Sequence, residues 1–177
     1  PPADYHLVTH LDNGRSVYTF CMCRGGVVVT AMSEKNTIVT NGMSYSLRDG
    51  ENANSAILCT VETSDFPGDS PLAGIELQEE YEKYAFAKNN SYNTTVQLVG
   101  DFLHGVPSKK LGKVIPSYRP GYVLGTVEDM LPKVLVDSIK QGIVNLDKKL
   151  HGFADSDSIL TGVETRSSAP YQVVRNQ

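Results

Sequence analysis

The sequence has few cysteines, no tryptophan and no long apolar run, and each shortage excludes a class of protein. Three cysteines in 177 residues do not form a disulfide framework, so we expect a reducing, cytoplasmic compartment. No stretch of about eighteen apolar residues is present, which predicts that no helix spans a membrane. The chain begins with Pro1 and Pro2 and shows no signal-peptide pattern, which fits an excised fragment.

Basic surfaces and familiar catalytic motifs are also missing. The net charge is −4 and the longest basic runs are Lys109-Lys110 and Lys148-Lys149, so we expect no nucleic-acid partner and no membrane surface as partner. No Gly-x-Gly-x-x-Gly follows a strand, so the dinucleotide-binding fingerprint is absent. No Gly-x-Ser-x-Gly elbow occurs, and the four histidines are scattered without metal-ligand spacing, so we expect no metal site.

The first third of the chain is rich in strand signals. Asp12-Asn13-Gly14 separates two β-like runs and predicts a hairpin. Gly25-Gly26 is expected to interrupt the β structure between two strands. The predicted strands are Tyr5–Leu11, Ser16–Cys23, Val27–Met32, Thr37–Thr40 and Ile57–Glu62.

Helical signals follow. Ser70 is expected to cap a helix that starts at Pro71, with an apolar stripe of Leu72, Ile75, Tyr81, Tyr84 and Ala85 and with Glu82 outside it. Val96–His104 fits either a strand or a helical turn, and Val106–Gly125 is expected to be a loop. A second helix is predicted from Pro132, with its stripe running to Leu150 and Gly152 ending it.

These elements predict an α+β fold: an antiparallel β meander or barrel-like sheet with a helical insertion, closed by C-terminal strands. The β-rich domain would comprise residues 1–64 and 156–177, and the mainly helical insertion residues 65–155.

The closing stretch, Ile159–Val174, has two apolar runs around a polar centre. Glu164 and Arg166 are two apart, so on an extended chain they would face one way and could form a polar floor for a ligand. The alternative is an exposed ion pair at a strand end, which contributes little.

Cys21-Met22-Cys23-Arg24-Gly25-Gly26 is the second candidate stretch. On a strand, Cys21 and Cys23 would face one way, either as small buried hydrophobic residues or as reactive thiols in a redox sensor. Gly25 and Gly26 would let the backbone approach a ligand closely.

The third candidate stretch is a dense polar loop from Asn41 to Asn54. Its side chains either bond their own backbone in turns or carry a binding site, with Asn41, Asn52 and Asn54 as candidates. Arg48 is the strongest candidate in it, because a guanidinium can fork onto a carboxylate or phosphate.

These stretches resemble a family of uncharacterised bacterial FAD-dependent dehydrogenases. The matching segments, in order, are Thr19–Gly26, Val39–Asn54, Pro71–Phe86, Ile115–Gly121 and the G-V-E-T-R-S-S-A-P segment that begins at Gly162. Relatives carry C-M-C-P-G-G, and Arg24 replaces the proline here, which affects the expected rigidity of that loop.

The resemblance implies that this chain is an internal, substrate-side domain of a longer oxidoreductase. The parent would bind FAD through a Rossmann-like remainder, and this domain would cover the flavin and form part of a pocket for a small-molecule substrate. The isolated chain would then be inactive and would not hold FAD. The alternative is a small non-catalytic α+β binding or interaction module. Neither the catalytic residues nor the substrate follow from the sequence.

Overall fold

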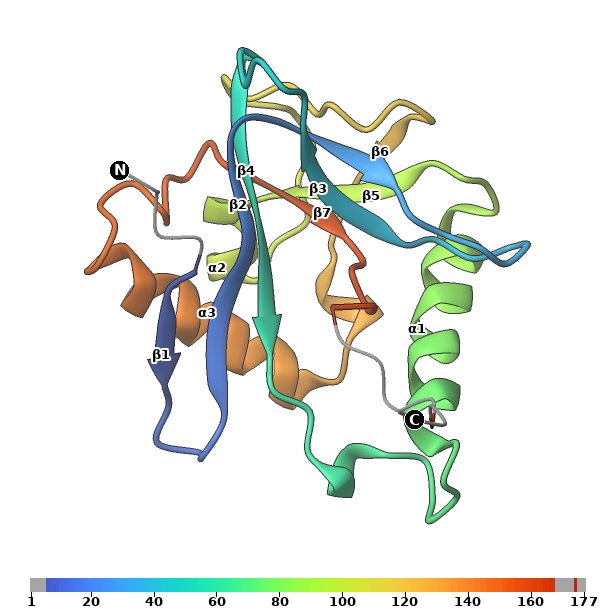
Figure 1. Cartoon of the computed structure of the whole chain (residues 1–177). Coiled ribbons are helices and arrows are strands. Elements are labelled where there is room, and N and C mark those ends of the chain that lie inside the picture. Colours follow the sequence, from blue (N-terminus) through green and yellow to red (C-terminus); the bar gives the residue numbers. More distant parts are fainter. Residues whose placement is uncertain (1–5, 168–173, 175–177) are drawn as a thin grey trace.

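The computed structural model describes residues 6–167 and Val174 and has two sheets and three α-helices (Figure 1). The first sheet contains β1 (Val8–His10), β2 (Ser16–Thr30), β3 (Thr40–Ser44) and β4 (Asn52–Cys59), all paired antiparallel. The second contains β6 (Tyr122–Leu124), β5 (Thr94–Leu98) and β7 (Ile159–Gly162) in that order, with β5 parallel to β6 and antiparallel to β7. The α+β class is confirmed.

The expected meander or barrel is wrong, because the described strands form two separate sheets and no closed barrel. Within the first sheet, β4 pairs with β2 rather than with β3. Val17 of β2 is paired with Thr9 of β1 on one edge and with Cys59 of β4 on the other. The strand β2 is therefore the centre of this sheet, with β1 and β3 at the two ends of one edge and β4 along the other.

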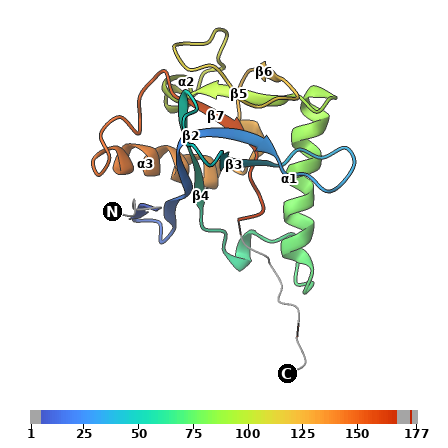
Figure 2. The ribbon, with the colours of Figure 1, turned by 45° about the horizontal axis from the view of Figure 1, so that its top comes forward.

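The hairpin predicted around Asn13 and Gly14 is confirmed. It joins β1 to β2 with His10 opposite Ser16, and Gly14 has a φ of 84°, a conformation that suits glycine. The expected break at Gly25-Gly26 is wrong, since β2 continues through both residues to Thr30. The β2–β4 pairing is instead irregular between Phe20 and Gly26. Such irregularity bends a strand without ending it, and Figures 1 and 2 show the second half of β2 running with β3 toward α1.

Two further strand boundaries differ from the expected ones. The strand β3 starts at Thr40, where the predicted strand ended, and β4 covers Asn52–Cys59 instead of Ile57–Glu62. Asn41, Asn52 and Asn54 therefore lie on strands, and only residues 45–51 form the connecting turn.

The helices are α1 (Ala73–Asn89), α2 (Val99–His104) and α3 (Lys133–Asp147), with short 3-10 turns η1 at Thr63–Asp65 and η2 at Glu128–Met130. The expected start of α1 is two residues early, and the Ser70 hydroxyl accepts a bond from the Leu72 N–H ahead of the helix. Val96–His104, which fits both helix and strand, contains the end of β5 and all of α2. Part of the expected loop, Tyr122–Leu124, forms β6.

Helix α3 covers the first sheet and carries the main core. It packs behind the lower halves of β2 and β4 (Figure 1). Its predicted stripe is confirmed at Leu135, Ile139, Ile143 and Leu146, which are buried. The two ends of the predicted stripe, Val134 and Leu150, are exposed, and the helix ends at Asp147 rather than at Gly152. Gly142 allows this close approach, since a side-chain carbon there would overlap Val17 of β2.

The closing segment differs from its prediction. β7 ends at Gly162 and pairs with β5, a strand inside the predicted insertion. The second apolar run of that segment, 171–173, lies outside the described residues, and Val174 is 90% exposed. The division into residues 1–64 with 156–177 and residues 65–155 stays a prediction. Within the described residues, no helix is both long and apolar enough to cross a bilayer.

Candidate functional site

A cavity of about 990 Å³ lies between the two sheets and the three helices. Its wall includes Met22 of β2, Ile57 of β4 and Leu160 of β7. Ligand pockets commonly have volumes of about 300 to 1,000 Å³, so this cavity is large enough for a small molecule.

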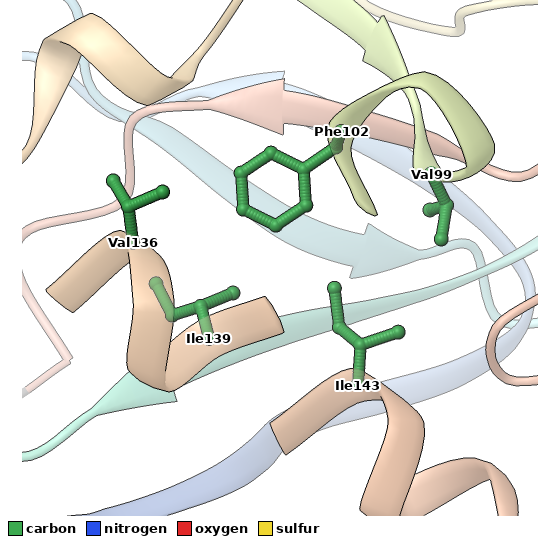
Figure 3. Close-up of a cluster of buried hydrophobic side chains, with 5 residues drawn as sticks. All are labelled: Val99, Phe102, Val136, Ile139 and Ile143. Atoms are coloured by element: carbon green, nitrogen blue, oxygen red, sulfur yellow. The ribbon is translucent and has the colours of Figure 1, made fainter. Parts of the chain in front are cut away.

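One part of the cavity wall is apolar. Helices α2 and α3 supply a cluster of buried side chains that point toward one another (Figure 3). The cluster consists of Val99, Phe102, Val136, Ile139 and Ile143. An apolar group of a ligand would suit this part of the wall, because the cluster offers no side-chain hydrogen-bonding partner to a polar group.

A polar part of the wall is centred on Asn54 of β4. Its side chain lies between two glycines: a Cβ atom at Gly26 would overlap Asn54 Oδ1, and one at Gly42 would overlap Asn54 Nδ2. Both amide atoms are nevertheless buried without a hydrogen-bond partner among the described residues. An unpartnered buried amide is costly, which points to a group that this chain alone does not supply.

Asn41 and Glu164 also line the cavity. The Thr40 N–H donates to the Val163 carbonyl at 2.8 Å, so the two chain segments contact each other one residue before Asn41 and Glu164. Asn41 Oδ1 is buried and, in the described part of the chain, has no donor. Burial raises the pKa of Glu164 from its ordinary value of 4.5 to about 7. This carboxyl can therefore hold or release a proton near neutral pH.

Tyr81 of α1 is a site residue that the sequence analysis missed. It lines the cavity, and its buried hydroxyl has no partner within residues 6–167. Burial first, and then the nearby charges of Glu80 and Asp65, raise its pKa to about 12, so it stays protonated. The available signal was a hydroxyl on the apolar stripe of the helix, but Tyr84 carries the same signal, and the stripe alone is equally typical of a core residue.

Five of the ten candidate residues from the sequence line the cavity, and the three candidate stretches all contribute to its wall. The five are Gly26, Asn41, Asn52, Asn54 and Glu164. Asn52 is already satisfied, because its amide donates to the Ile115 carbonyl at 3.0 Å. The other five, Cys21, Cys23, Gly25, Arg48 and Arg166, are not part of the wall.

Arg166 does not share a polar floor with Glu164. Its guanidinium forks onto Glu82 of α1, with Nε to Oε1 at 2.7 Å and Nη2 to Oε2 at 2.6 Å, and Nη1 donates to Ser33. Glu82, expected outside the helix stripe, is fully buried. Its second partner is the hydroxyl of Thr165, which donates to Oε1 at 2.6 Å. The ion pair therefore fixes the segment that carries Glu164 against α1.

Arg48 is exposed in the turn between β3 and β4, with a φ of 52°. Among the residues that the structure describes, its side chain has no ion pair. Gly25 touches the same turn, since a Cβ atom there would overlap the Arg48 carbonyl. These two residues shape the turn and do not reach the cavity.

Cys21 and Cys23 are half-buried and free. Burial, followed by the charges of Glu164 and Cys23, raises the pKa of the Cys21 thiol. A raised pKa lowers the fraction of reactive thiolate, which disfavours Cys21 as a redox-sensing thiol.

Within residues 6–167, no glycine-rich strand-to-helix turn is present that would cradle the phosphates of FAD. The unpartnered amide atoms on the wall, Asn41 Oδ1 and both atoms of Asn54, can accept and donate hydrogen bonds. Residues 6–167 also contain no group of three histidine, cysteine or acidic side chains that could hold a metal ion.

Comparison with known proteins assigns the chain to a family. The model of the family described as FAD-dependent protein, C-terminal domain-like, matches residues 1–167. The chain belongs to this family. The resemblance to FAD-dependent proteins noted in the sequence is thereby confirmed. The family implies a flavoprotein parent with FAD as its cofactor.

A relative from Clostridium beijerinckii, described as an uncharacterized protein, is 52% identical over 176 residues. The match covers 98% of this chain and 33% of that relative, so the chain spans about a third of the relative's length. A domain of this family is thus found within a longer polypeptide. Whether FAD-binding sequence lies on both sides of it stays a prediction.

Proposed function

We propose that this chain is the substrate-side domain of a FAD-dependent oxidoreductase. In this proposal the remainder of the parent binds FAD through its own dinucleotide-binding motif. The present domain covers the flavin and forms part of the pocket for a small-molecule substrate. When bound, FAD supplies the electron-transfer chemistry, and the protein supplies binding and orientation.

The observation that carries the proposal is the set of buried polar atoms without partners on a cavity wall. They belong to Asn41, Asn54 and Tyr81. A protein of this size leaves few such groups unsatisfied, and three on one cavity are explained if a ligand completes them. Glu164, with its pKa near 7, would hold or accept a proton next to that ligand.

The test is a visible absorbance spectrum of the purified parent polypeptide beside this chain, before and after reduction with dithionite. We expect a flavin band that bleaches in the parent and no band in the isolated chain. Parent protein without flavin would contradict the proposal and favour the non-catalytic binding module.

A second measurement tests the pocket. In the parent, Asn54→Ala should lower the rate of electron transfer between the substrate and the flavin while leaving the flavin content unchanged. Asn145→Ala, at a half-buried position of α3 outside the cavity wall, is the matched control. Loss of flavin in Asn54→Ala would assign Asn54 to the cofactor instead.

A further inference from the structure

The charge of the cavity wall restricts what it can bind. Among the lining residues that the structure describes, there is no lysine and no arginine, and the ionisable ones are Glu51, His151, Glu164, Tyr18, Tyr81 and Cys59. The nearby guanidinium of Arg166 is held by Glu82 and Ser33. A carboxylate or phosphate on the ligand would therefore be buried without a cation to pair with it.

The hydrogen-bonding atoms of the wall define the polar head of the ligand. Asn54 offers a free donor, Nδ2, and a free acceptor, Oδ1. Asn41 offers a further acceptor and Tyr81 a hydroxyl that does both. A carbonyl oxygen and an N–H or O–H are the two kinds of group that Nδ2 and Oδ1 of Asn54 lack as partners.

The body of the ligand follows from the rest of the wall. The cavity is continuous, and the cluster of Val99, Phe102, Val136, Ile139 and Ile143 offers no side-chain hydrogen-bonding group. A polar or charged body would lose its hydration there without compensation.

We propose that the cavity binds a substrate without a negative charge, with an apolar body and a head that carries both a carbonyl acceptor and a hydrogen-bond donor. The head lies against Asn54 and Asn41, and the body lies between α2 and α3. This inference rests on the proposed function only in calling the ligand a substrate. The cavity and the charge of its wall are properties of the chain itself. Asn54 is a specificity-determining residue in this arrangement, because Gly26 and Gly42 fix its amide.

The experiment compares three probes that share one apolar body and differ in the head: octanamide, octanoate and octylammonium. Binding to the flavin-loaded parent is measured by isothermal titration calorimetry at pH 7. We expect octanamide to bind at least about tenfold more tightly than octanoate, because the carboxylate of octanoate would be buried without a cation, and at least as tightly as octylammonium. Asn54→Ala should weaken octanamide by about three- to tenfold, and Asn145→Ala should not.

Other outcomes overturn the inference or the proposed function. Octanoate equal to octanamide would overturn the inference, because a cation from the rest of the parent would then face the cavity, and octylammonium tighter than octanamide would overturn it because Glu51 or Glu164 would then select a cation. Unchanged octanamide affinity in Asn54→Ala, together with a shifted flavin spectrum, would assign the polar wall to the flavin ring. A further result would be a parent that contains no flavin and still binds octanamide, with Asn54→Ala weakening that binding. This result would overturn the oxidoreductase proposal and leave the inferred ligand class standing.

Discussion

The guanidinium of Arg166 forks onto the carboxylate of Glu82, and the two residues are 84 positions apart in the chain. Glu82 is fully buried, whereas the Arg166 side chain is 36% exposed. The pair joins α1 to the segment after β7. Because that segment carries Glu164, the ion pair positions one wall of the cavity.

Removing one partner of this pair should be strongly destabilising. We expect Arg166→Ala to lower the free energy of unfolding by about 2 to 4 kcal/mol, since Glu82 would keep a buried charge without its cation. Urea unfolding followed by circular dichroism measures it. The control is Lys83→Ala on the same helix, which breaks the exposed pair with Glu79 and should change stability far less, because solvent screens that pair. Equal losses in both variants would contradict the structural role of the pair.

Asn54 and Gly42 should be energetically coupled. The added carbon in Gly42→Ala would overlap Asn54 Nδ2. No atom outside the Asn54 side chain lies within 3.4 Å of that carbon. We expect Gly42→Ala to cost about 1 to 3 kcal/mol of unfolding free energy through overpacking. The double variant with Asn54→Ala should recover most of that loss.

A double-mutant cycle in urea measures this coupling. Additive losses, with no recovery in the double variant, would show that Gly42 is required for a reason other than the space occupied by Asn54.

Local patterns were sufficient for the elements whose residues are near one another in sequence. The hairpin at Asn13-Gly14 and the stripe of α3 depend on turn chemistry and on helical spacing, and both are confirmed. The continuation of β2 through Gly25-Gly26 depends on β3 and β4, which supply its hydrogen bonds from outside the local window. A pair of glycines reads as a break unless those strands are known.

The site was predicted in part for the same reason. The polar residues of the three candidate stretches were visible, but their partners were not. Arg166 looked free for a ligand because nothing in the sequence shows that Glu82 is buried beside it. Tyr81 looked like a core residue because a helical stripe does not reveal whether a hydroxyl has a partner.

Tyr81 should show the trade between stability and function that is common at binding sites. Tyr81→Phe removes a buried hydroxyl without a partner in the described chain, so we expect the isolated domain to gain about 1 kcal/mol of unfolding free energy. Tyr84→Phe on the same helix, at a side chain that is 46% exposed, should change stability little. Thermal unfolding of both variants measures the difference. A loss of stability in Tyr81→Phe would mean that the hydroxyl already has a partner.

Glu164 should make the stability of the domain fall as the pH rises. Its pKa is about 7 in the folded chain, above the ordinary value of 4.5. Below about pH 4.5 the carboxyl is protonated in both states and costs nothing. Between pH 4.5 and 7 the unfolded chain releases the proton while the folded chain keeps it, so the free energy of unfolding decreases.

Above pH 7 both states are ionised, and the loss is complete. Glu164→Gln should therefore be more stable than the wild type at pH 8 by about 1 to 2 kcal/mol, a figure reduced for the partial exposure of the side chain, and equal to it at pH 4. Urea titrations across this range measure the difference, and Glu164→Asp, which keeps a carboxyl, should retain the pH dependence. A difference between wild type and Glu164→Gln that stays constant from pH 4 to 8 would place the carboxyl in water rather than on the cavity wall.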